Sequence, residues 1–231
     1  MNILIVVAGG KGLRAGLGYN KIFAKLNGDS ILSLNLKTIE KAEVIDSIII
    51  SAKKVDVGKI NTIILKNKFK KVLKILSSSK SRQSSTFKVL KWIKKNNIKA
   101  TLVGVHNAVN PFVTKNEINN VFLEASKYGA ALLAYPARDT VKISDKKGVV
   151  SYTPVREKSW YAQTPQVGHF EDMYKAFDKA GKQGFSGTDD TQLLEKIGVT
   201  VKIVPCSYQN LKITFPEDLI IAKRLKKLVS Y

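Results

Sequence analysis

Continuous apolar runs alternate along the chain with amphipathic stretches, and this alternation predicts the fold. The apolar runs that predict strands cover residues 2–7, 47–51, 100–106 and 130–135. The stretches with apolar side chains at helical spacing cover residues 30–41, 82–95 and 115–127. Continuous apolar runs are typical of parallel strands that are covered on both faces. Strand, helix and strand in succession predict an α/β sandwich with right-handed crossovers.

Residues 141–155 depart from this pattern because apolar and polar residues alternate around Asp145-Lys-Lys-Gly148. Alternation on both sides of a turn signal predicts a β-hairpin. An isolated two-stranded ribbon is marginally stable in water. We therefore expect this hairpin to pack against something else, plausibly a second subunit.

A further helix is predicted at the end of the chain. Thr214 and Glu217 have the spacing of a capping box, and Pro216 falls in the first turn. The helix is expected to run to about Leu228.

Composition limits the class of protein. The 231 residues are 44% hydrophobic, which suits a single domain, residues 1–231, with a real core. No apolar stretch approaches the roughly 20 residues that span a bilayer, and the N-terminus lacks the basic region of a signal peptide. The single cysteine, Cys206, permits no internal disulfide and fits a reducing compartment. We expect a soluble cytoplasmic protein with no membrane partner.

The net charge of +21 raises the possibility of nucleic-acid binding, because basic clusters neutralise phosphates. However, only five of the 39 basic residues are arginines, and the lysines are spread along the whole chain. Arginine is the better phosphate ligand, so a dedicated nucleic-acid binder is expected to use more of it. The composition favours a solvated lysine-rich surface and no nucleic-acid partner.

The first predicted strand ends in the loop A8-G9-G10-K11-G12-L13-R14. Ligands bind at the carboxyl ends of strands in such sheets, so this loop is expected to meet the loops at 107–111 and 138–140. A P-loop would need Ser or Thr after Gly-Lys, and a dinucleotide site would need an acidic residue where the second strand ends in Ser51-Ala52-Lys53. Glycine amides with two cations, Arg14 and Lys21, suit a triphosphate better.

Several motifs occur in the order found in one known family. They are A-G-G-K-G-L-R with Lys21, S-R-Q-S-S (81–85), V-H-N-A-V-N-P (105–111), P-A-R-D-T-V-K (136–142), Y-A-Q-T-P-Q (161–166), T-D-D-T-Q (188–192) and N-L-K-I-T (210–214). Together they resemble the 2-C-methyl-D-erythritol 4-phosphate cytidylyltransferase family over essentially the whole chain. The resemblance implies a Rossmann-like three-layer sandwich, of the nucleotide-diphospho-sugar transferase type, with a protruding β-arm at about 139–160 that forms a homodimer.

The implied reaction joins CTP and the polyol phosphate, with release of pyrophosphate, in the non-mevalonate isoprenoid pathway. By resemblance, Arg14, Lys21 and Lys212 are the catalytic cations. The implied CTP-binding residues are Ala8, Gly9, Gly10, Gly12, Ser79, Arg82, Ser85 and Asn107. The implied acceptor-binding residues are Asn110, Asp139, Thr140, Arg156 and Thr188, reached across the dimer. The simpler interpretations are that the serines cap a helix and that Arg156 pairs with Glu157 or Asp145 at the surface.

The chain departs from the family pattern at several positions. Asn107 and Asn110 stand where the family usually has an aspartate near the metal and an arginine near the acceptor, Asn20 stands where it usually has a proline, and Ser78-Ser79 replaces a glycine pair. An amide supplies no negative charge, so we expect Mg²⁺ to be held mostly by the CTP phosphates and only weakly by Asn107. Two alternatives remain: another acceptor such as ribitol 5-phosphate, or a CTP-binding protein with impaired turnover.

Overall fold

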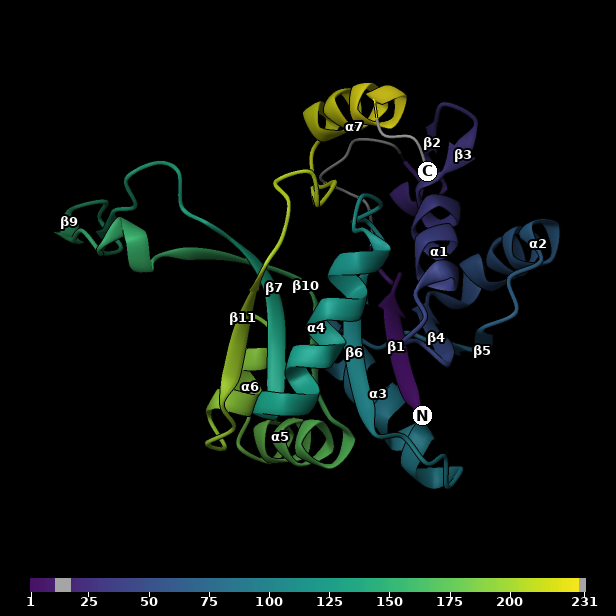
Figure 1. The fold of residues 1–231 in the computed structure, drawn as a ribbon, viewed down its shortest axis with the longest axis horizontal. Coiled ribbons are helices and arrows are strands. Elements are labelled where there is room, and N and C mark those ends of the chain that lie inside the picture. Colours follow the sequence, from purple (N-terminus) through teal and green to yellow (C-terminus); the bar gives the residue numbers. More distant parts are fainter. Residues whose placement is uncertain (11–17, 229–231) are drawn as a thin grey trace.

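A computed structural model describes residues 1–10 and 18–228, and a seven-stranded sheet forms its centre (Figure 1). The strand order is β11-β7-β10-β6-β1-β4-β5, and β10 is the antiparallel member. The strands of the sheet are β1 (Asn2–Val7), β4 (Ser47–Ala52), β5 (Val72–Ser77), β6 (Leu102–Asn107), β7 (Ala130–Pro136), β10 (Trp160–His169) and β11 (Val201–Pro205). The predicted mostly parallel sheet is confirmed.

Helices cover both faces of the sheet, which completes the predicted three layers. They are α1 (Ile31–Lys41), α2 (Val57–Asn67), α3 (Arg82–Lys95), α4 (Lys115–Tyr128), α5 (Phe170–Lys182) and α6 (Thr191–Glu195). The last helix, α7 (Pro216–Leu228), packs instead against the short strand β2 (Lys25–Leu26). One apolar core joins α1, α2 and α4 to the sheet, and a second joins α3, α5 and α6 to its other face. The sheet is therefore buried on both sides, as its apolar sequence predicts. No helix in the described ranges has the length and hydrophobicity to cross a membrane.

Local sequence explains where the helices that flank the site begin. Ser81 caps α3 by accepting from the Ser84 amide, and Thr114 caps α4 by accepting from the Glu117 amide. In both helices the third residue returns the bond to the cap, which satisfies two otherwise unpaired backbone donors. The cap at Ser81 fixes the direction in which the chain enters α3.

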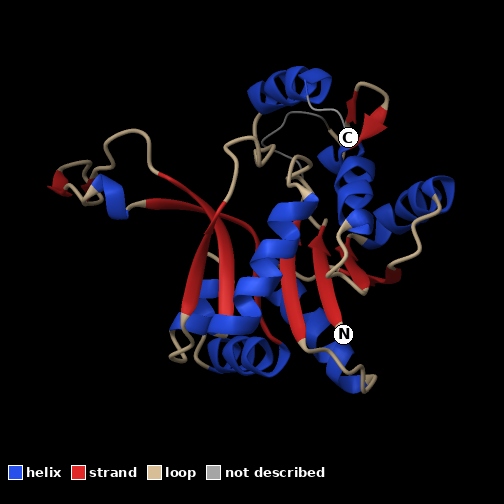
Figure 2. Cartoon of the chain, in the orientation of Figure 1, coloured by secondary structure: helices blue, strands red, loops and turns tan. Residues whose placement is uncertain are grey.

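The predicted hairpin is confirmed and forms the tip of an arm that projects from the sheet (Figure 1). Short strands β8 (Ile143–Ser144) and β9 (Val150–Tyr152) pair antiparallel. The Asp145 carboxylate accepts from the Lys147 and Val149 amides at 2.8 and 3.0 Å, and Gly148 closes the turn with φ +82°. Figure 2 shows that most of the remaining arm is irregular chain.

The predicted start of the last helix is corrected. The helix begins at Pro216 rather than Thr214, and Asp218 rather than Glu217 supplies the capping carboxylate. Asp218 Oδ2 accepts from the Thr214 and Phe215 amides at 2.7 and 2.9 Å. Proline is therefore the first helical residue, where its missing N–H leaves no helix bond unmade.

Candidate active site

A cleft of about 700 Å³ lies at the carboxyl ends of the parallel strands β1, β4, β5 and β6. Its described lining consists of Val7–Gly10, Asn20–Ile22, Lys53, Ser78–Arg82, Ser85, Asn107, Val109 and Lys212. These residues come from segments far apart in sequence. The parallel arrangement of the strands brings their ends to one edge, as the sequence predicted for residues 8–10 and for the loop at 107–111, whereas residues 138–140 do not line the cleft.

Close packing of two loops forms one wall of the cleft. A Cβ atom built on Gly9 would lie 2.6 Å from Cβ of Ser78, closer than real Cβ atoms approach. Only glycine allows the end of β1 to approach the loop after β5 this closely. The glycine at position 9 therefore determines the width of the cleft on this side.

The described lining of the cleft is positively charged. It contains Lys21, Lys53, Lys80, Arg82 and Lys212, and its described residues include no carboxylate. A concave surface with one sign of charge concentrates ligands of the opposite sign. The cleft is therefore suited to a polyanion of the size of a nucleoside triphosphate.

Two of these cations come from opposite ends of the chain. Lys21 opens the 3-10 helix η2 (Lys21–Phe23), and Lys212 lies in the segment before α7. The Lys21 ammonium lies 3.5 Å from the Thr214 carbonyl oxygen, so η2 and the Lys212 segment adjoin. The fold thus places both predicted catalytic lysines on one cleft.

A serine-rich loop between β5 and α3 also lines the cleft. Ser85 Oγ accepts from the Ser79 amide at 2.9 Å and donates to the Ser81 carbonyl at 2.7 Å. The buried Ser85 hydroxyl has thereby used its single proton within the loop. The Ser79 and Ser81 amides and the Ser81 carbonyl are bonded within the loop, so the backbone of Lys80, which also lines the cleft, is the better candidate for contacts with a base.

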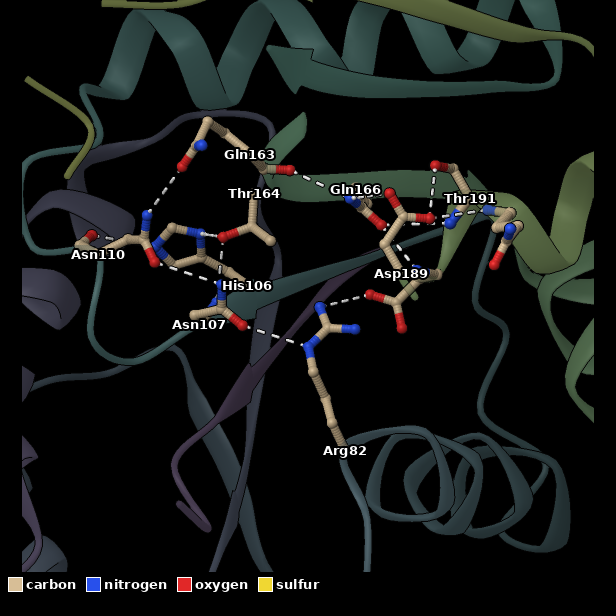
Figure 3. A network of polar contacts seen from close by, with 11 residues as sticks. Arg82, His106, Asn107, Asn110, Gln163, Thr164, Gln166, Asp189 and Thr191 are labelled. Atoms are coloured by element: carbon tan, nitrogen blue, oxygen red, sulfur yellow. Dashed lines mark hydrogen bonds and ion pairs between the residues drawn. The ribbon is translucent and has the colours of Figure 1, made fainter. Parts of the chain in front are cut away.

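Arg82 links the cleft to a polar network behind it (Figure 3). Its Nε donates to Asn107 Oδ1 at 3.2 Å, and its Nη2 lies 2.6 Å from Asp190 Oδ2. Burial raises the pKa of Asp190 above its usual range, and the guanidinium of Arg82 opposes that rise. The guanidinium is therefore held from two sides, by an amide oxygen and by a carboxyl group.

His106 occupies the centre of this network and is fully buried (Figure 3). Its Nδ1 lies 3.0 Å from Thr164 Oγ1, and its Nε2 lies 3.0 Å from Asn35 Nδ2. Burial lowers the pKa of His106 to about 4. The imidazole is neutral at physiological pH and joins β6 to β10.

Comparison with known proteins identifies the family. A sequence model of the 2-C-methyl-D-erythritol 4-phosphate cytidylyltransferase family matches residues 2–227. Relatives described by this activity include one from Alkaliphilus oremlandii, 35% identical over 97% of this chain and 94% of the relative. Another, from Clostridium acetobutylicum, is 37% identical over 98% of each chain.

The chain belongs to this family.

Solved structures of cytidylyltransferases have a similar fold. The 4-diphosphocytidyl-2C-methyl-D-erythritol synthase of Anaerococcus prevotii is 31% identical with a TM-score of 0.87, over 98% of this chain and 96% of that one. The 2-C-methyl-D-erythritol 4-phosphate cytidylyltransferase of Francisella tularensis is 28% identical with a TM-score of 0.77, over 96% of this chain and 98% of that one.

Most residues predicted for the cytidylyltransferase site meet in the cleft. They are Ala8, Gly9, Gly10, Lys21, Ser79, Arg82, Ser85, Asn107 and Lys212. Gly12 and Arg14 lie outside the described residues. The nucleotide roles that the resemblance implies for these residues remain predictions.

The predicted acceptor residues lie elsewhere. Asn110 is 0% exposed and donates to the Asn210 carbonyl at 3.1 Å, so its side chain is held inside the protein and does not line the cleft. Asp139, Thr140 and Arg156 are exposed on the arm, and Thr188 is exposed before α6. Arg156 lies 3.6 Å from Glu157, the surface pairing that the sequence analysis held as the alternative.

The described residues do not fit a metal held by the protein. Within residues 1–10 and 18–228 no cluster of three or more His, Cys, Asp or Glu side chains can hold an ion. Asn107, the predicted weak ligand, already accepts from the Arg82 cation through Oδ1. A divalent ion at that oxygen would be repelled by the guanidinium.

Four polar residues of the site had no role predicted from the sequence. Lys53 and Lys80 line the cleft, Asp190 pairs with Arg82, and Asn20 supports the turn of Lys21. Lys53 follows a predicted parallel strand, and that position at a strand's carboxyl end was the signal available for it. The motif T-D-D-T-Q contains Asp190 but does not predict its pairing with Arg82, because that partner lies more than 100 positions away in the chain.

Proposed function

We propose that this chain joins CTP and 2-C-methyl-D-erythritol 4-phosphate to give 4-diphosphocytidyl-2-C-methyl-D-erythritol and pyrophosphate. The full-length match to the cytidylyltransferase family supports the activity. The observation that carries the mechanism is the cleft lined by Lys21, Arg82 and Lys212 with no carboxylate among its described residues. We further propose that the protein works in the cytoplasm, in the non-mevalonate isoprenoid pathway.

An oxygen of the acceptor phosphate attacks the α-phosphorus of CTP, and the bond from that phosphorus to the β-phosphate oxygen breaks. The attacking phosphate is already ionised, so no general base is required. The barrier comes from bringing two anions together and from charge on the reacting phosphorus. Lys21 and Lys212 stabilise that charge from two sides, and Arg14 joins them in the proposed triphosphate site.

The base is recognised by the loop between β5 and α3. Cytosine is small, so its recognition depends on hydrogen bonds more than on volume. The loop is ordered by Ser85, and the backbone of Lys80 within it offers a donor and an acceptor of fixed direction. Arg82 and Asn107 border this loop and complete the proposed CTP-binding surface.

We propose that Mg²⁺ is held by the CTP phosphates. The lining of the cleft supplies no described carboxylate to bind it, and the Asn107 oxygen is neutral and faces Arg82. The ion commonly keeps several waters and binds substrate phosphates rather than a protein cage. Bound in this way, it would neutralise part of the triphosphate charge.

We propose that the arm completes the acceptor site of a second subunit. Arg156, Asp139 and Thr140 are exposed on the arm, and the arm also exposes Val150 and Tyr152. Exposed apolar residues on a thin ribbon need a partner surface to stabilise it. In a two-fold homodimer each arm would reach the other chain.

The test is pyrophosphate release with CTP, Mg²⁺ and one acceptor at a time. Release with 2-C-methyl-D-erythritol 4-phosphate and little release with ribitol 5-phosphate is expected. Preference for ribitol 5-phosphate would replace the acceptor but keep the reaction class. CTP binding without release from any acceptor would contradict the proposed activity. Strongly salt-dependent DNA binding would contradict the assignment of the basic surface to solvent.

A further inference from the structure

The side chain of Asn20 is buried beside Lys21 and forms three hydrogen bonds. Asn20 is 7% exposed. Its Nδ2 donates to the Ala8 carbonyl at 2.9 Å and to Asp56 Oδ2 at 2.8 Å, and its Oδ1 accepts from the Ile22 amide at 3.4 Å. One amide therefore uses both its donors and its acceptor on three different segments.

These three segments meet at the cleft. Ala8 follows β1, Ile22 lies in the turn that Lys21 opens, and Asp56 ends the 3-10 helix η3 (Lys54–Asp56) that leads into α2. Asn20 caps η2 through the bond to Ile22. The residue thus fixes the position of the turn of Lys21 against the end of β1 and the start of α2.

Asp56 determines which way the Asn20 amide faces. An ionised carboxylate only accepts hydrogen bonds, and the Ala8 carbonyl also only accepts. Both therefore require the Nδ2 group of Asn20 on their side. Oδ1 must then face the Ile22 amide, which leaves one orientation that satisfies every partner. Asp56 is itself 8% exposed, so little water competes for these bonds.

We propose that Asn20, oriented by Asp56, is a positioning residue for Lys21 in the cytidyl transfer. A lysine side chain is flexible, and its effect on a transition state depends on where its backbone is held. The bonds of the Asn20 side chain to Ala8, Asp56 and Ile22 hold that backbone. The inference rests on the proposed catalytic role of Lys21.

The first experiment removes the donor from the Asn20–Asp56 hydrogen bond and then restores a donor from the Asp56 side. Asn20→Asp removes both amide donors and places a carboxylate against Asp56 and the Ala8 carbonyl. We expect kcat at pH 8 to fall about tenfold or more, with a smaller change in KM for CTP, since charge-assisted bonds are lost. Adding Asp56→Asn restores one donor to the pair, and kcat should recover about threefold or more.

Asn67→Asp is the matched control. Asn67 ends α2, and its amide donates to the Ile63 carbonyl at 2.8 Å and accepts from Ser33 Oγ at 3.3 Å. This variant also removes an asparagine donor but touches no residue of the cleft lining. A lower midpoint of thermal unfolding with unchanged kcat is expected. Asn20→Ala, which adds no charge, provides a second variant if Asn20→Asp fails to fold.

A double-mutant cycle with Lys21→Ala distinguishes positioning from general loss of structure. If Asn20 acts through Lys21, Asn20→Ala should lower the single-turnover rate by less than about twofold once Lys21 is absent. An equally large effect of Asn20→Ala when Lys21 is absent would overturn the inference. A normal kcat in Asn20→Ala would also overturn it, as would a folded Asn20→Asp, Asp56→Asn protein whose kcat does not recover. Turnover by the unaltered protein tests the proposed function separately from these ratios.

Discussion

Arg82 and Asp190 form an ion pair with a 2.6 Å separation between Nη2 and Oδ2 at the back of the cleft. The Asp190 side chain is 2% exposed, whereas that of Arg82 is 30% exposed. The backbone amide of Asp190 is also held, by Gln166 Oε1 at 2.8 Å. A buried carboxyl on a fixed backbone thus orients a cation that faces the proposed nucleotide.

Replacing Asp190 should affect both stability and CTP binding. Asp190→Asn removes the buried charge that opposes the partly exposed guanidinium of Arg82, and loss of one partner of a buried pair costs about 3 kcal/mol. We expect the free energy of unfolding in urea to fall by roughly this amount and the KM for CTP to rise. Asp178→Asn breaks the surface pair with Lys182, 2.7 Å apart, and should leave stability nearly unchanged because solvent screens the pair. Equal effects of the two variants would contradict the account.

Lys212 provides the clearest test of the proposed charge stabilisation. Lys212→Ala should lower kcat by about 10²–10³, the usual effect of losing one preorganised donor to a transition state. Lys212→Arg retains the charge and should lose less. Lys127→Ala, which breaks an exposed pair with Glu124, is the control and should leave steady-state rates unchanged. A similar loss from Lys127→Ala would contradict a specific role for Lys212.

Asn107→Asp tests the proposal that the protein contributes little to metal binding. A carboxylate would add the negative charge that the cleft lining lacks, although Arg82 would compete for it. We expect the Mg²⁺ concentration for half-maximal rate to fall. The measurement is initial rate against Mg²⁺ at saturating CTP for both proteins. An unchanged Mg²⁺ dependence would indicate that Arg82 neutralises the new group.

The buried His106 predicts a specific loss of stability in acid. Burial lowers its pKa from 6.5 to about 4, so between these values the unfolded chain binds a proton that the folded chain does not. Its contribution to stability is therefore intact above pH 6.5 and declines as pH falls toward 4. The loss between pH 7 and pH 5 should be about 2 kcal/mol. The measurement is urea unfolding at pH 7 and pH 5 for the unaltered protein and for His106→Gln. The difference between the two proteins gives the loss of stability due to His106.

The sequence predicted the elements that carry strong apolar patterns. The predicted bounds of β1 and α3 agree with the structure, because a continuous apolar run and a helix with apolar spacing are local properties. β10 was not predicted: its polar residues and Pro165 argue against a strand, and its pairing with β7 shifts between Ala162 and Gln166. β5 was not predicted because it is a half-exposed edge strand.

The residues of the candidate site also differ in whether the sequence alone could predict them. The glycine loop follows a strand directly, so position alone indicated it. Lys21 was linked to that loop by its charge, whereas Lys212 was found only through family resemblance. The pairs Asn20–Asp56 and Arg82–Asp190 join side chains that approach only after the sheet forms. Asn110 was expected to face the acceptor, but its amide fills the space between Asn107 and Asn210. No spacing along the chain predicts such contacts.

The arm exposes apolar side chains that are suited to a subunit interface. If the arm completes the site of a second subunit, Val150→Asp with Tyr152→Asp should weaken the dimer, because charges would replace exposed apolar side chains at the interface. Light scattering after size-exclusion chromatography should then show monomers, with unfolding unchanged. Lys146→Asp at the exposed turn is the control for added charge and should remain dimeric.

Mixed dimers test whether Arg156 acts across the interface. Lys21→Ala and Arg156→Ala should each reduce activity strongly as homodimers. After unfolding and refolding an equimolar mixture, half the dimers would be mixed and each would hold one intact site, so about a quarter of the normal activity should return. Both substitutions in one chain, refolded with an equal amount of the unaltered chain, provide the reference for assembly. Activity equal to the mean of the two homodimers would show that Arg156 does not serve the partner's site.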